Sequence, residues 1–430
     1  MAGDSLSFAS ALNRLSILRP LRERNFRLLW LGQSVSILGD QFHLVALPLL
    51  VLHLTGSSLA LGTVLVASTV PRVALYLVGG AITDLISPHK LLLSATLVRT
   101  ICSGFLAAMV MLDILCLWHL FVLGAVFGTM DAFFSPAIKT FIPSLVSEEQ
   151  LTAGNALLQG SSQLHRFMGP SLAGLVIASI GMGPAFGIDA MSFVFVGLCL
   201  LLMTPPRPGT NAIEPDSSTA EKPPAKTRFW LLHSIREGLT YALREPSIRS
   251  FMIIIGMVEF SFAGPFTVGL AILSQREFGG GATTYGVMLS ALAGGLLLGT
   301  LTAGVIKSLT RIGSRLMLII ATLGTGLVLL GTAPNVIWAS VLLFLMGTAG
   351  GYSQILTVVW LQTKVDPQMR GRVFSVVLFF VYGLTPLSYV ITGFMTQFGT
   401  ASMFITTGTC VLLGLLICFL SRNIQRLDET

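Results

Sequence analysis

The chain has 430 residues, of which 53% are hydrophobic and only 10% are charged, whereas a soluble domain carries about 25% charged residues. This composition excludes a soluble enzyme and a disulfide-rich secreted domain. The net charge of +7 comes from basic residues that separate apolar runs, so the chain lacks the clustered basic face that nucleic-acid binding requires.

Apolar runs bounded by charged residues or by Gly, Pro and Asn turns repeat along the chain. We expect them to be membrane-spanning helices, because backbone in lipid must satisfy its hydrogen bonds within its own segment and a span needs roughly 20 residues. The sequence therefore predicts an all-α membrane protein with twelve spans. In chain order these are 26–52, 57–83, 91–112, 118–139, 154–180, 185–203, 250–273, 283–307, 315–332, 336–362, 373–396 and 401–420.

The N-terminal segment and the cysteines add two expectations. Residues 1–24 contain arginines but no short apolar core before a small-residue cleavage site. We therefore expect no removable signal peptide, and the first span should stay as an anchor. All five cysteines lie inside apolar stretches without the spacing of a metal site or a disulfide framework, so we expect packing roles for them and no metal.

Basic residues fall on alternate loops. Of the 26 Lys and Arg residues, all but Arg72, Arg99, Arg166 and Arg276 lie near the chain ends or in every second loop. Cytoplasmic flanks of membrane spans are enriched in Lys and Arg. The sequence therefore predicts a multi-pass protein of the plasma (inner) membrane with both termini in the cytoplasm.

A polar segment divides the predicted spans six and six. Residues 204–228 hold six prolines with Ser, Thr, Glu and Lys, a composition that cannot bury a core. Residues 229–244 favour either an amphipathic helix on the inner membrane surface or an extension of the seventh span. We therefore predict an N-terminal six-helix bundle (1–203), a cytoplasmic linker with an amphipathic helix (204–249) and a C-terminal six-helix bundle (250–430).

The two halves contain a weak internal repeat. Residues 61–84 and 285–308 align Gly62 with Gly286 and Gly80 with Gly304 at one offset. Transporters built from two such repeats enclose a central site near the membrane midplane. The repeat favours that arrangement here.

Several longer stretches then occur in a specific order. They include NFRLLWLGQSVSILGDQFHLVALPLLVLHLTGSSLALG at 25–62, HRFMGPSLAGLVIASIGMGPAFGIDAMSFV at 165–194 and LQTKVDPQMRGRVFSV at 361–376. Together they resemble the major facilitator superfamily, and within it the enterobactin and macrolide exporters, over essentially the whole chain. The resemblance implies the major facilitator fold, with the first, fourth, seventh and tenth spans lining a central cavity.

The loop after the second predicted span departs from the superfamily's Gly-x-x-x-Asp-Arg-x-Gly-Arg-Arg pattern. Gly80 and Asp84 are present, but the basic cluster is nearly absent. In the superfamily that cluster is associated with holding the halves together in the outward-facing state. The resemblance therefore implies a weaker or differently built latch, in which Asp84 makes a gating contact near Arg370 or Arg372.

The fifth predicted span contains Gly169 and Pro170 followed by Gly174. These residues are similar to an element associated with antiporters, which would place Gly169 and Pro170 in gating. They are equally consistent with a proline kink and close packing of small residues between helices.

Ionisable residues also lie inside the predicted spans, where they are costly and usually face a cavity or one another. An unpaired buried charge is unfavourable, so we expect a network that joins Asp40 and Asp131 to one or more arginines. Such a network serves proton coupling, or it is permanently paired and fixes helix packing. The residues concerned are Asp40, Asp131, Glu259, Arg72, Arg99, Arg166 and Asp189.

Proton coupling follows from how a carboxylate responds to its surroundings. Burial disfavours the charged form of a carboxylate and a nearby arginine favours it. Helix movement that alternately wets and dries Asp40 would therefore take up a proton on one side and release it on the other. A carboxylate held by an arginine in both states would not couple.

The central cavity is expected to be apolar with scattered polar and aromatic groups, which suits a bulky amphipathic ligand. Within it, His43 is either a packing or network residue or a proton carrier. The candidate cavity residues are Gln33, Gln41, His43, Phe133, Phe134, Phe260, Tyr352, Gln354 and Tyr382.

The sequence contains no Gly-rich phosphate loop, metal-binding His pair or nucleophile turn. We therefore expect no enzyme, no ATP-driven pump and no cofactor, with the proton gradient as energy source. The leading hypothesis is an exporter of amphipathic small molecules, such as drugs, macrolides or siderophores, by proton antiport. Two alternatives are an uncoupled facilitator or flippase for lysophospholipid-like or siderophore substrates, and a transporter-shaped receptor or membrane scaffold.

The expected partners are a small amphipathic substrate and the lipid bilayer. We expect no nucleic acid. A monomer is the default, since two bundles already provide a complete pathway.

Overall fold

The computed structural model describes residues 16–83, 87–204, 236–237, 239–305, 312–366 and 369–420. Within these ranges the surroundings of the side chains of 16, 76–83, 305, 312 and 418–420 are not described. Every regular element in the described residues is helical.

The helices before the polar segment are long and follow one another through short turns. They are α2 (Arg24–Thr55), α3 (Ser58–Thr83), α4 (Pro88–Met111), α5 (Leu117–Phe141), α6 (Glu148–Ile180) and α7 (Met182–Leu201), with short 3-10 helices η1 (Ser16–Arg22) and η2 (Ile142–Ser144). The helix α2 is followed by Gly56, whose φ of 62° is in the left-handed region and whose N–H donates to Leu52 O, as is common after a helix.

The helices after the polar segment begin with a composite rod. Its parts are α9 (Pro246–Gly264), a π-helical turn η3 (Pro265–Gly269), α10 (Leu270–Ile272) and a second π-helical turn η4 (Leu273–Glu277). The remaining elements are α11 (Gly281–Val305), α12 (Ile312–Leu330), α13 (Val336–Lys364), α14 (Arg370–Met395), η5 (Thr396–Phe398) and α15 (Thr400–Leu420). The side chain of Asn335 caps the start of α13 by accepting a hydrogen bond from Trp338 N at 2.9 Å.

Eleven helices in the described ranges are long and apolar enough to cross a membrane, counting α9 to η4 as one. The predicted span that is missing from these eleven is 154–180, which lies in α6. That helix is 33 residues long and carries Ser, Gln, Asn, His and Arg residues between its apolar ones. Its polarity, not its length, separates it from the others.

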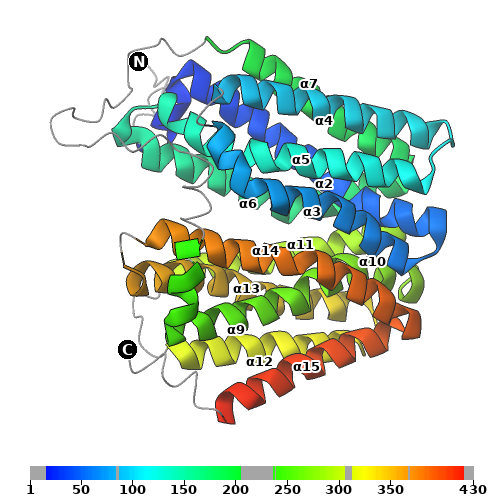
Figure 1. Ribbon diagram of the computed structural model, residues 1–430. Coiled ribbons are helices and arrows are strands. Elements are labelled where there is room, and N and C mark those ends of the chain that lie inside the picture. The colour runs from blue at the N-terminus through cyan, green and yellow to red at the C-terminus, as the bar shows by residue number, and fades with distance from the viewer. Residues whose placement is uncertain are drawn as a thin grey trace, which may run out of the picture.

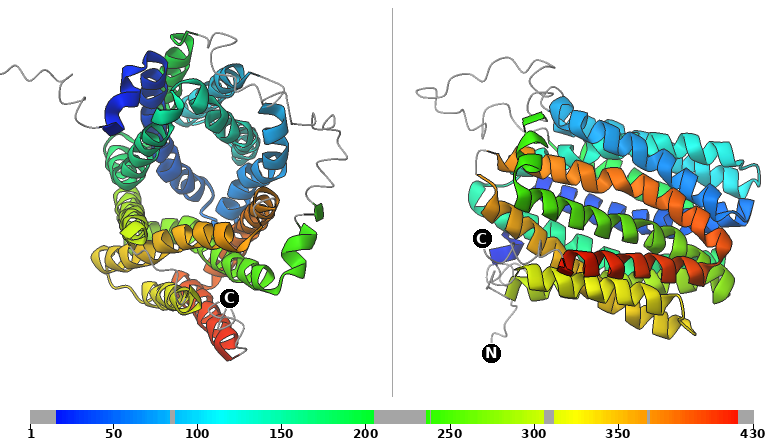
Figure 2. Two further views of the ribbon diagram at one scale, coloured as in Figure 1. Left: turned by 90° about the vertical axis from the view of Figure 1, so that its left-hand side faces the viewer. Right: turned by 60° about the horizontal axis from the view of Figure 1, so that its bottom comes forward.

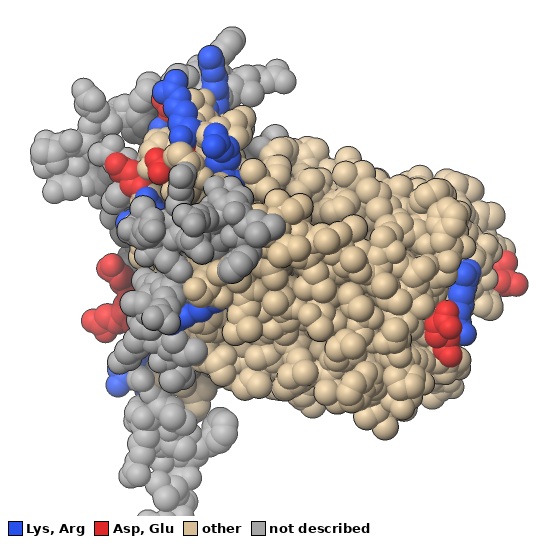
Figure 3. Space-filling model, turned by 90° about the horizontal axis from the view of Figure 1, so that it is seen from below, with Lys and Arg blue, Asp and Glu red and all other residues tan. Residues whose placement is uncertain are grey.

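The surface has the character expected for a lipid environment. Large apolar side chains are widely exposed, for example Ile337 at 78% and Leu318 at 69%, and such exposure is rare in soluble monomers. Figure 3 shows the charged side chains gathered toward the two ends of one face, with a broad belt of other residues between them. The molecule is a multi-span membrane protein.

The helices form two groups that meet at one end. In Figure 1, α2 to α7 lie together above and α9 to α15 lie together below. We call the end at which α2 begins and α15 ends the basic end, because Arg24, Lys90, Lys139 and Arg370 lie there. The opposite end, where Gly56 follows α2, is called the sealed end.

Close backbone contacts join the two groups toward the sealed end. A Cβ at Gly62 of α3 would collide with the backbone of Tyr389 in α14, and a Cβ at Gly286 of α11 would collide with the backbone of Pro170 in α6. Gly62 and Gly286, one of the two glycine pairs that the internal repeat aligns, therefore occupy equivalent crossings between the groups. Toward the basic end the groups diverge (Figures 1 and 2).

Hydrogen bonds reinforce the sealed end. Ser58 Oγ donates to Gly393 O at 2.8 Å. The guanidinium of Arg276, a basic residue outside the alternate loops that carry most of the Lys and Arg residues, donates to Gly56 O at 2.6 Å. Both bonds link α2 or α3 to the other group.

The described residues just before α9 are helical at 236–237 and at 239–244. Figure 1 shows this segment running across the ends of the long helices instead of continuing α9. Its Glu237 forms an ion pair with Arg372 near the start of α14. Residues 205–235, which include most of the predicted linker, lie outside the described residues.

Candidate functional site

A cavity of about 620 Å³ lies between the two helix groups. The first group contributes α3, α4, α5 and α6 to its wall, and α14 contributes from the second group. A site built from both groups changes shape whenever they move relative to one another. Its lining residues are Arg72, Val73, Arg99, Asp131, Phe134, Ser135, Arg166, Ser375, Leu378, Phe379 and Tyr382.

Arg99 of α4 and Asp131 of α5 form an ion pair in the wall of this cavity. Arg99 is buried, at 7% exposure, and its guanidinium carbon lies 4.5 Å from the ring centroid of Phe134. This distance is within cation–π range. The Asp131 side chain is 36% exposed, so the pair is anchored on the arginine side and open on the carboxylate side.

Arg72 and Arg166 line the same cavity without such a partner. Among the described residues, no carboxylate lies within ion-pairing distance of either guanidinium. Arg72 is half-buried and Arg166 is exposed. Of the expected network joining Asp40 and Asp131 to one or more arginines, the structure shows the pair of Asp131 with Arg99. Two further positive charges line the cavity.

Asp40 lies on α2 behind this wall and is not among the residues that line the cavity. Its carboxylate is within electrostatic range of Arg99, Asp189, His43 and Arg166. None of the described residues makes a direct hydrogen bond or ion pair with it. Asp40 therefore occupies a charged region without being held by a single partner.

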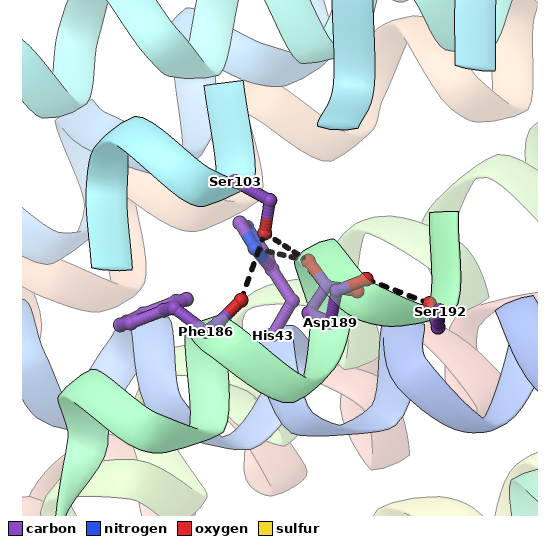
Figure 4. Close-up of polar contacts among 5 residues, drawn as sticks. All are labelled: His43, Ser103, Phe186, Asp189 and Ser192. Carbon is purple, nitrogen blue, oxygen red and sulfur yellow. Dashed lines mark hydrogen bonds and ion pairs between the residues drawn. The ribbon is translucent and has the colours of Figure 1, made fainter. Parts of the chain in front are cut away.

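A buried polar cluster joins α2, α4 and α7 (Figure 4). Ser103 Oγ donates to Asp189 Oδ2 at 2.6 Å, and His43 Nδ1 lies 3.5 Å from the same oxygen. Asp189 is fully buried. The His43 ring packs against Phe127 and Phe186, with centroid distances of 5.0 and 5.5 Å.

The close approach of α2 and α7 explains why this cluster forms. A Cβ at Gly39 would collide with the Ser192 side chain and would touch Asp189 Oδ1. Ser192 Oγ in turn donates to Asp189 O at 2.7 Å. The Gly39–Asp40 pair thus brings Asp40 and Asp189 into one region because glycine occupies the crossing point.

Glu259 of α9 lies apart from these charges. It is half-buried and has no ion-pair partner among the described residues. Its carboxyl group lies within electrostatic range of the Tyr389 hydroxyl on α14, as does the guanidinium of Arg72. The structure therefore does not bring Asp40, Asp131 and Glu259 together in one cavity wall.

The predicted cavity residues divide between several places. Phe134 and Tyr382 line the cavity. The Tyr352 hydroxyl accepts a hydrogen bond from Arg315 at 3.1 Å in a separate hollow between α12 and α13. The predicted residues that are not among the lining residues of the central cavity are Gln33, Gln41, His43, Phe133, Phe260, Tyr352 and Gln354.

The lining residues that the sequence did not single out are Val73, next to Arg72, and four residues that lie at helical spacing from named ones. On α14, Ser375, Leu378 and Phe379 share a face with Tyr382, because residues three and four apart are neighbours on a helix. Ser135 follows Asp131 by four residues on α5. Helical spacing from the named residues was therefore the sequence signal that could have identified these lining residues.

The predicted gating residues make other contacts in the structure. Gly169 lets α6 approach Gln41 of α2, and the backbone of Pro170 meets Gly286 of α11, so this element packs helices closely. Arg370 Nε donates to Val365 O at 3.1 Å.

The remaining gating residues are only partly described. Arg372 pairs with Glu237. Asp84 lies outside the described residues, and Gly80 lies in the last turns of α3, whose side-chain surroundings are not described.

The sequence profile of the family described as transmembrane secretion effectors matches residues 15–430. The chain belongs to this family of the major facilitator superfamily. In the part of the chain that the structure describes, no group of His, Cys, Asp and Glu side chains is arranged to hold a metal ion.

Relatives of this chain with similar sequences include efflux proteins. Macrolide efflux protein A from Streptococcus pyogenes is 22% identical over 94% of this chain and 97% of its own length. Multidrug efflux pump Tap from Mycolicibacterium fortuitum is 25% identical over 91% of this chain and 94% of its own. Enterobactin exporter EntS from Escherichia coli is 26% identical over 81% and 79%.

Solved structures share the major facilitator fold. A mutant of the nucleoside transporter NupG superposes with a TM-score of 0.75 at 12% identity, covering 94% of this chain and 99% of that one. A bacterial homologue of the iron transporter ferroportin in an inward-facing state gives 0.67 at 17% identity, covering 95% and 99%. These relatives and this fold are those of transporters, not enzymes.

Proposed function

We propose that this major facilitator protein is a secondary exporter of amphipathic small molecules, such as drugs, macrolides or siderophores, driven by proton antiport. The observation that carries the proposal is the charged cavity between the two helix groups, which are joined toward one end and diverge toward the other. A movement that opened the sealed end and closed the basic end would expose the cavity to the other side of the membrane.

The membrane arrangement is part of the proposal. We propose that α6 is the twelfth span, so that α2 to α7 and α9 to α15 form two six-helix bundles. The basic residues at one end favour a cytoplasmic location for that end and for both termini, in the plasma membrane. With this orientation the cavity opens toward the cytoplasm, where an export substrate enters.

Asp40 is the proposed coupling residue. It has four ionisable groups in electrostatic range but no direct partner among the described residues. A small helix movement can therefore change which charge dominates at its carboxylate, and so its protonation. Asp131 is a weaker candidate because Arg99 holds it. The chain acts as a monomer without a bound cofactor in this proposal.

Transport by purified protein in proteoliposomes tests the proposal. A pH gradient should drive substrate accumulation, and addition of substrate should in turn move protons. The variant Asp40→Asn should lose gradient-driven accumulation while keeping its folded yield. The matched control is Asp113→Asn, an exposed acid at the sealed end, which should transport like wild type. Full pH-driven accumulation by Asp40→Asn would move the coupling site elsewhere.

An uncoupled facilitator or flippase for lysophospholipid-like or siderophore substrates is the alternative. Its signature is substrate movement that equilibrates across the membrane without moving protons. A receptor or scaffold of this shape would move no substrate under any gradient. Simultaneous measurement of substrate and protons in the same vesicles separates the three.

A further inference from the structure

We propose that the central cavity is selective for organic anions, and that Arg72 and Arg166 together bind the acidic group of the ligand. The inference rests on the proposed export function, because it names the class of substrate for that site. It concerns which ligands the cavity binds, and not the proton gradient that drives transport.

The charge of the cavity wall carries the argument. Among the described residues, three arginines line it against one carboxylate, Asp131, and that carboxylate is paired with Arg99. Neither Arg72 nor Arg166 forms an ion pair with a carboxylate among the described residues. Charged groups within a membrane protein are costly unless they are paired or lie in a watered cavity. An anion in this cavity supplies the missing partner.

The positions of the two arginines suit a shared ligand. Arg72 comes from α3 and Arg166 from α6, so they approach the cavity from different helices of the first group. A guanidinium offers a planar set of N–H donors that matches a carboxylate or phosphate in a bidentate manner. Two such groups favour an acidic ligand over a neutral one.

The other residues of the cavity wall determine which kind of ligand body fits beside the acidic group. Phe134 on α5 and Leu378 and Phe379 on α14 provide apolar surface, and a cavity of about 620 Å³ is within the range of small-molecule sites. The ligand class is therefore an amphipathic organic anion, with an acidic head and an apolar or aromatic body.

A cationic ligand finds no equivalent anchor in this wall. Asp131 is engaged by Arg99, and neither Asp40 nor Glu259 is among the lining residues. Arg72 and Arg166 would also repel a cation and so lower its affinity for the cavity. Such unfavourable contacts contribute to specificity.

The test compares two dyes that share a xanthene ring but differ in charge. Carboxyfluorescein is the anionic probe and tetramethylrhodamine ethyl ester is the cationic one. Binding of each to the full-length protein in nanodiscs is measured by fluorescence polarisation. Carboxyfluorescein should bind more tightly than the cationic dye. Arg72→Gln and Arg166→Gln should each weaken carboxyfluorescein binding by about tenfold to a hundredfold, as expected for loss of one charged hydrogen-bond partner.

Control variants separate recognition from folding. Arg315→Gln removes an arginine from the separate hollow between α12 and α13 and should leave carboxyfluorescein binding unchanged. Arg72→Lys and Arg166→Lys keep the charge and should recover part of the affinity. A preference of the wild type for the cationic dye, no carboxyfluorescein binding, or unchanged binding in both Gln variants would overturn the inference.

Two sources share the required chemistry, a water-soluble organic acid and the headgroup of an anionic phospholipid. Nanodiscs with phosphatidylglycerol are compared with nanodiscs of phosphatidylcholine alone. Competition by phosphatidylglycerol that disappears in Arg72→Gln would support the anion site and assign it to the lipid. Equal carboxyfluorescein affinity in both bilayers would support the site and assign it to soluble anions.

Failure of the inference and failure of the proposed function give different results. Gradient-driven export of the cationic dye, unaffected by Arg72→Gln, would leave the exporter in place and remove its anion selectivity. Arginine-dependent binding of carboxyfluorescein with no transport of either dye would keep the anion site and remove the export function.

Discussion

Arg99 and Asp131 are the one cavity pair whose loss should change stability. Replacing Asp131 with Asn leaves the buried Arg99 guanidinium without its anionic partner. Because Asp131 is itself partly exposed, the expected loss lies between that of surface and buried pairs, about 1–3 kcal/mol. Thermal unfolding of the purified protein in detergent measures it. The double variant Arg99→Gln with Asp131→Asn should recover much of the loss.

Arg166 provides the contrast to this pair. It is exposed to the cavity and forms no ion pair among the described residues. The free energy of unfolding of Arg166→Gln should therefore lie within about 0.5 kcal/mol of the wild-type value. A large loss of stability in Arg166→Gln, with none in Asp131→Asn, would contradict the assignment of the ion pair to Arg99.

Ser103 supports the fully buried carboxylate of Asp189. Ser103→Ala removes the hydrogen bond to Asp189 Oδ2, and an unsatisfied buried acceptor costs about 1–3 kcal/mol. We expect a lower unfolding temperature in detergent. The matched control is Ser179→Ala, because the exposed Ser179 hydroxyl bonds only to carbonyls of its own helix. Equal stability of the two variants would mean that the cluster does not hold α4 and α7 together.

At the scale of helices, the seal between the groups depends on glycines at two crossings. Gly62→Val and Gly286→Val would each place a branched side chain against the backbone of the opposite group. The expected result is a shift toward conformations that are open at the sealed end. The reporter is Ser58→Cys in a protein whose five native cysteines are replaced, because Ser58 is only 3% exposed in the closed seal.

Labelling of Ser58→Cys by a membrane-impermeant maleimide should be slow in the otherwise unchanged protein and severalfold faster with either valine. Gly187→Val is the control, since nothing lies within 4 Å of the position of its Cβ, and it should not alter the rate. Equal shielding of Ser58→Cys in all four proteins would show that these crossings do not govern the seal.

The bounds of a helix could be predicted well where a continuous run of apolar residues defines the helix. The predicted spans 336–362 and 401–420 correspond to α13 at Val336–Lys364 and α15 at Thr400–Leu420. The sequence placed the fifth span at 154–180, whereas α6 starts at Glu148. Its first turns are too polar to be recognised from apolar length, although they continue the same hydrogen-bonded helix.

The partners of the charges could not be predicted from sequence. The sequence singled out every ionisable residue of the cavity wall, but the choice of Arg99 as the partner of Asp131 depends on how α4 and α5 are rotated about their axes. Tyr352 illustrates the same limit, because the rotation of α13 directs it to Arg315 and away from the central cavity. Periodicity identifies a face of a helix but not which neighbour that face meets.

The orientation of the whole molecule in the membrane has a direct reporter in Cys116. This cysteine is exposed and precedes α5 at the sealed end. Cys102 and Cys199 are buried, and Cys410 is exposed within α15. With the basic end in the cytoplasm, Cys116 faces the outside of the cell. In a protein whose Cys410 and Cys418 are replaced by Ser, a membrane-impermeant maleimide should therefore label intact cells, and Cys116→Ser should abolish that labelling.

A second cysteine tests the opposite end of the molecule. Lys139 is exposed near the end of α5 at the basic end. In a Cys116→Ser background, Lys139→Cys should react only after the cells are permeabilised, because one helix length separates the two positions and places them on opposite sides of the bilayer. Labelling of Lys139→Cys from outside, together with protection of Cys116, would reverse the orientation. The cavity would then open away from the cytoplasm, and a protein in this conformation would be poised to take up its substrate from outside the cell.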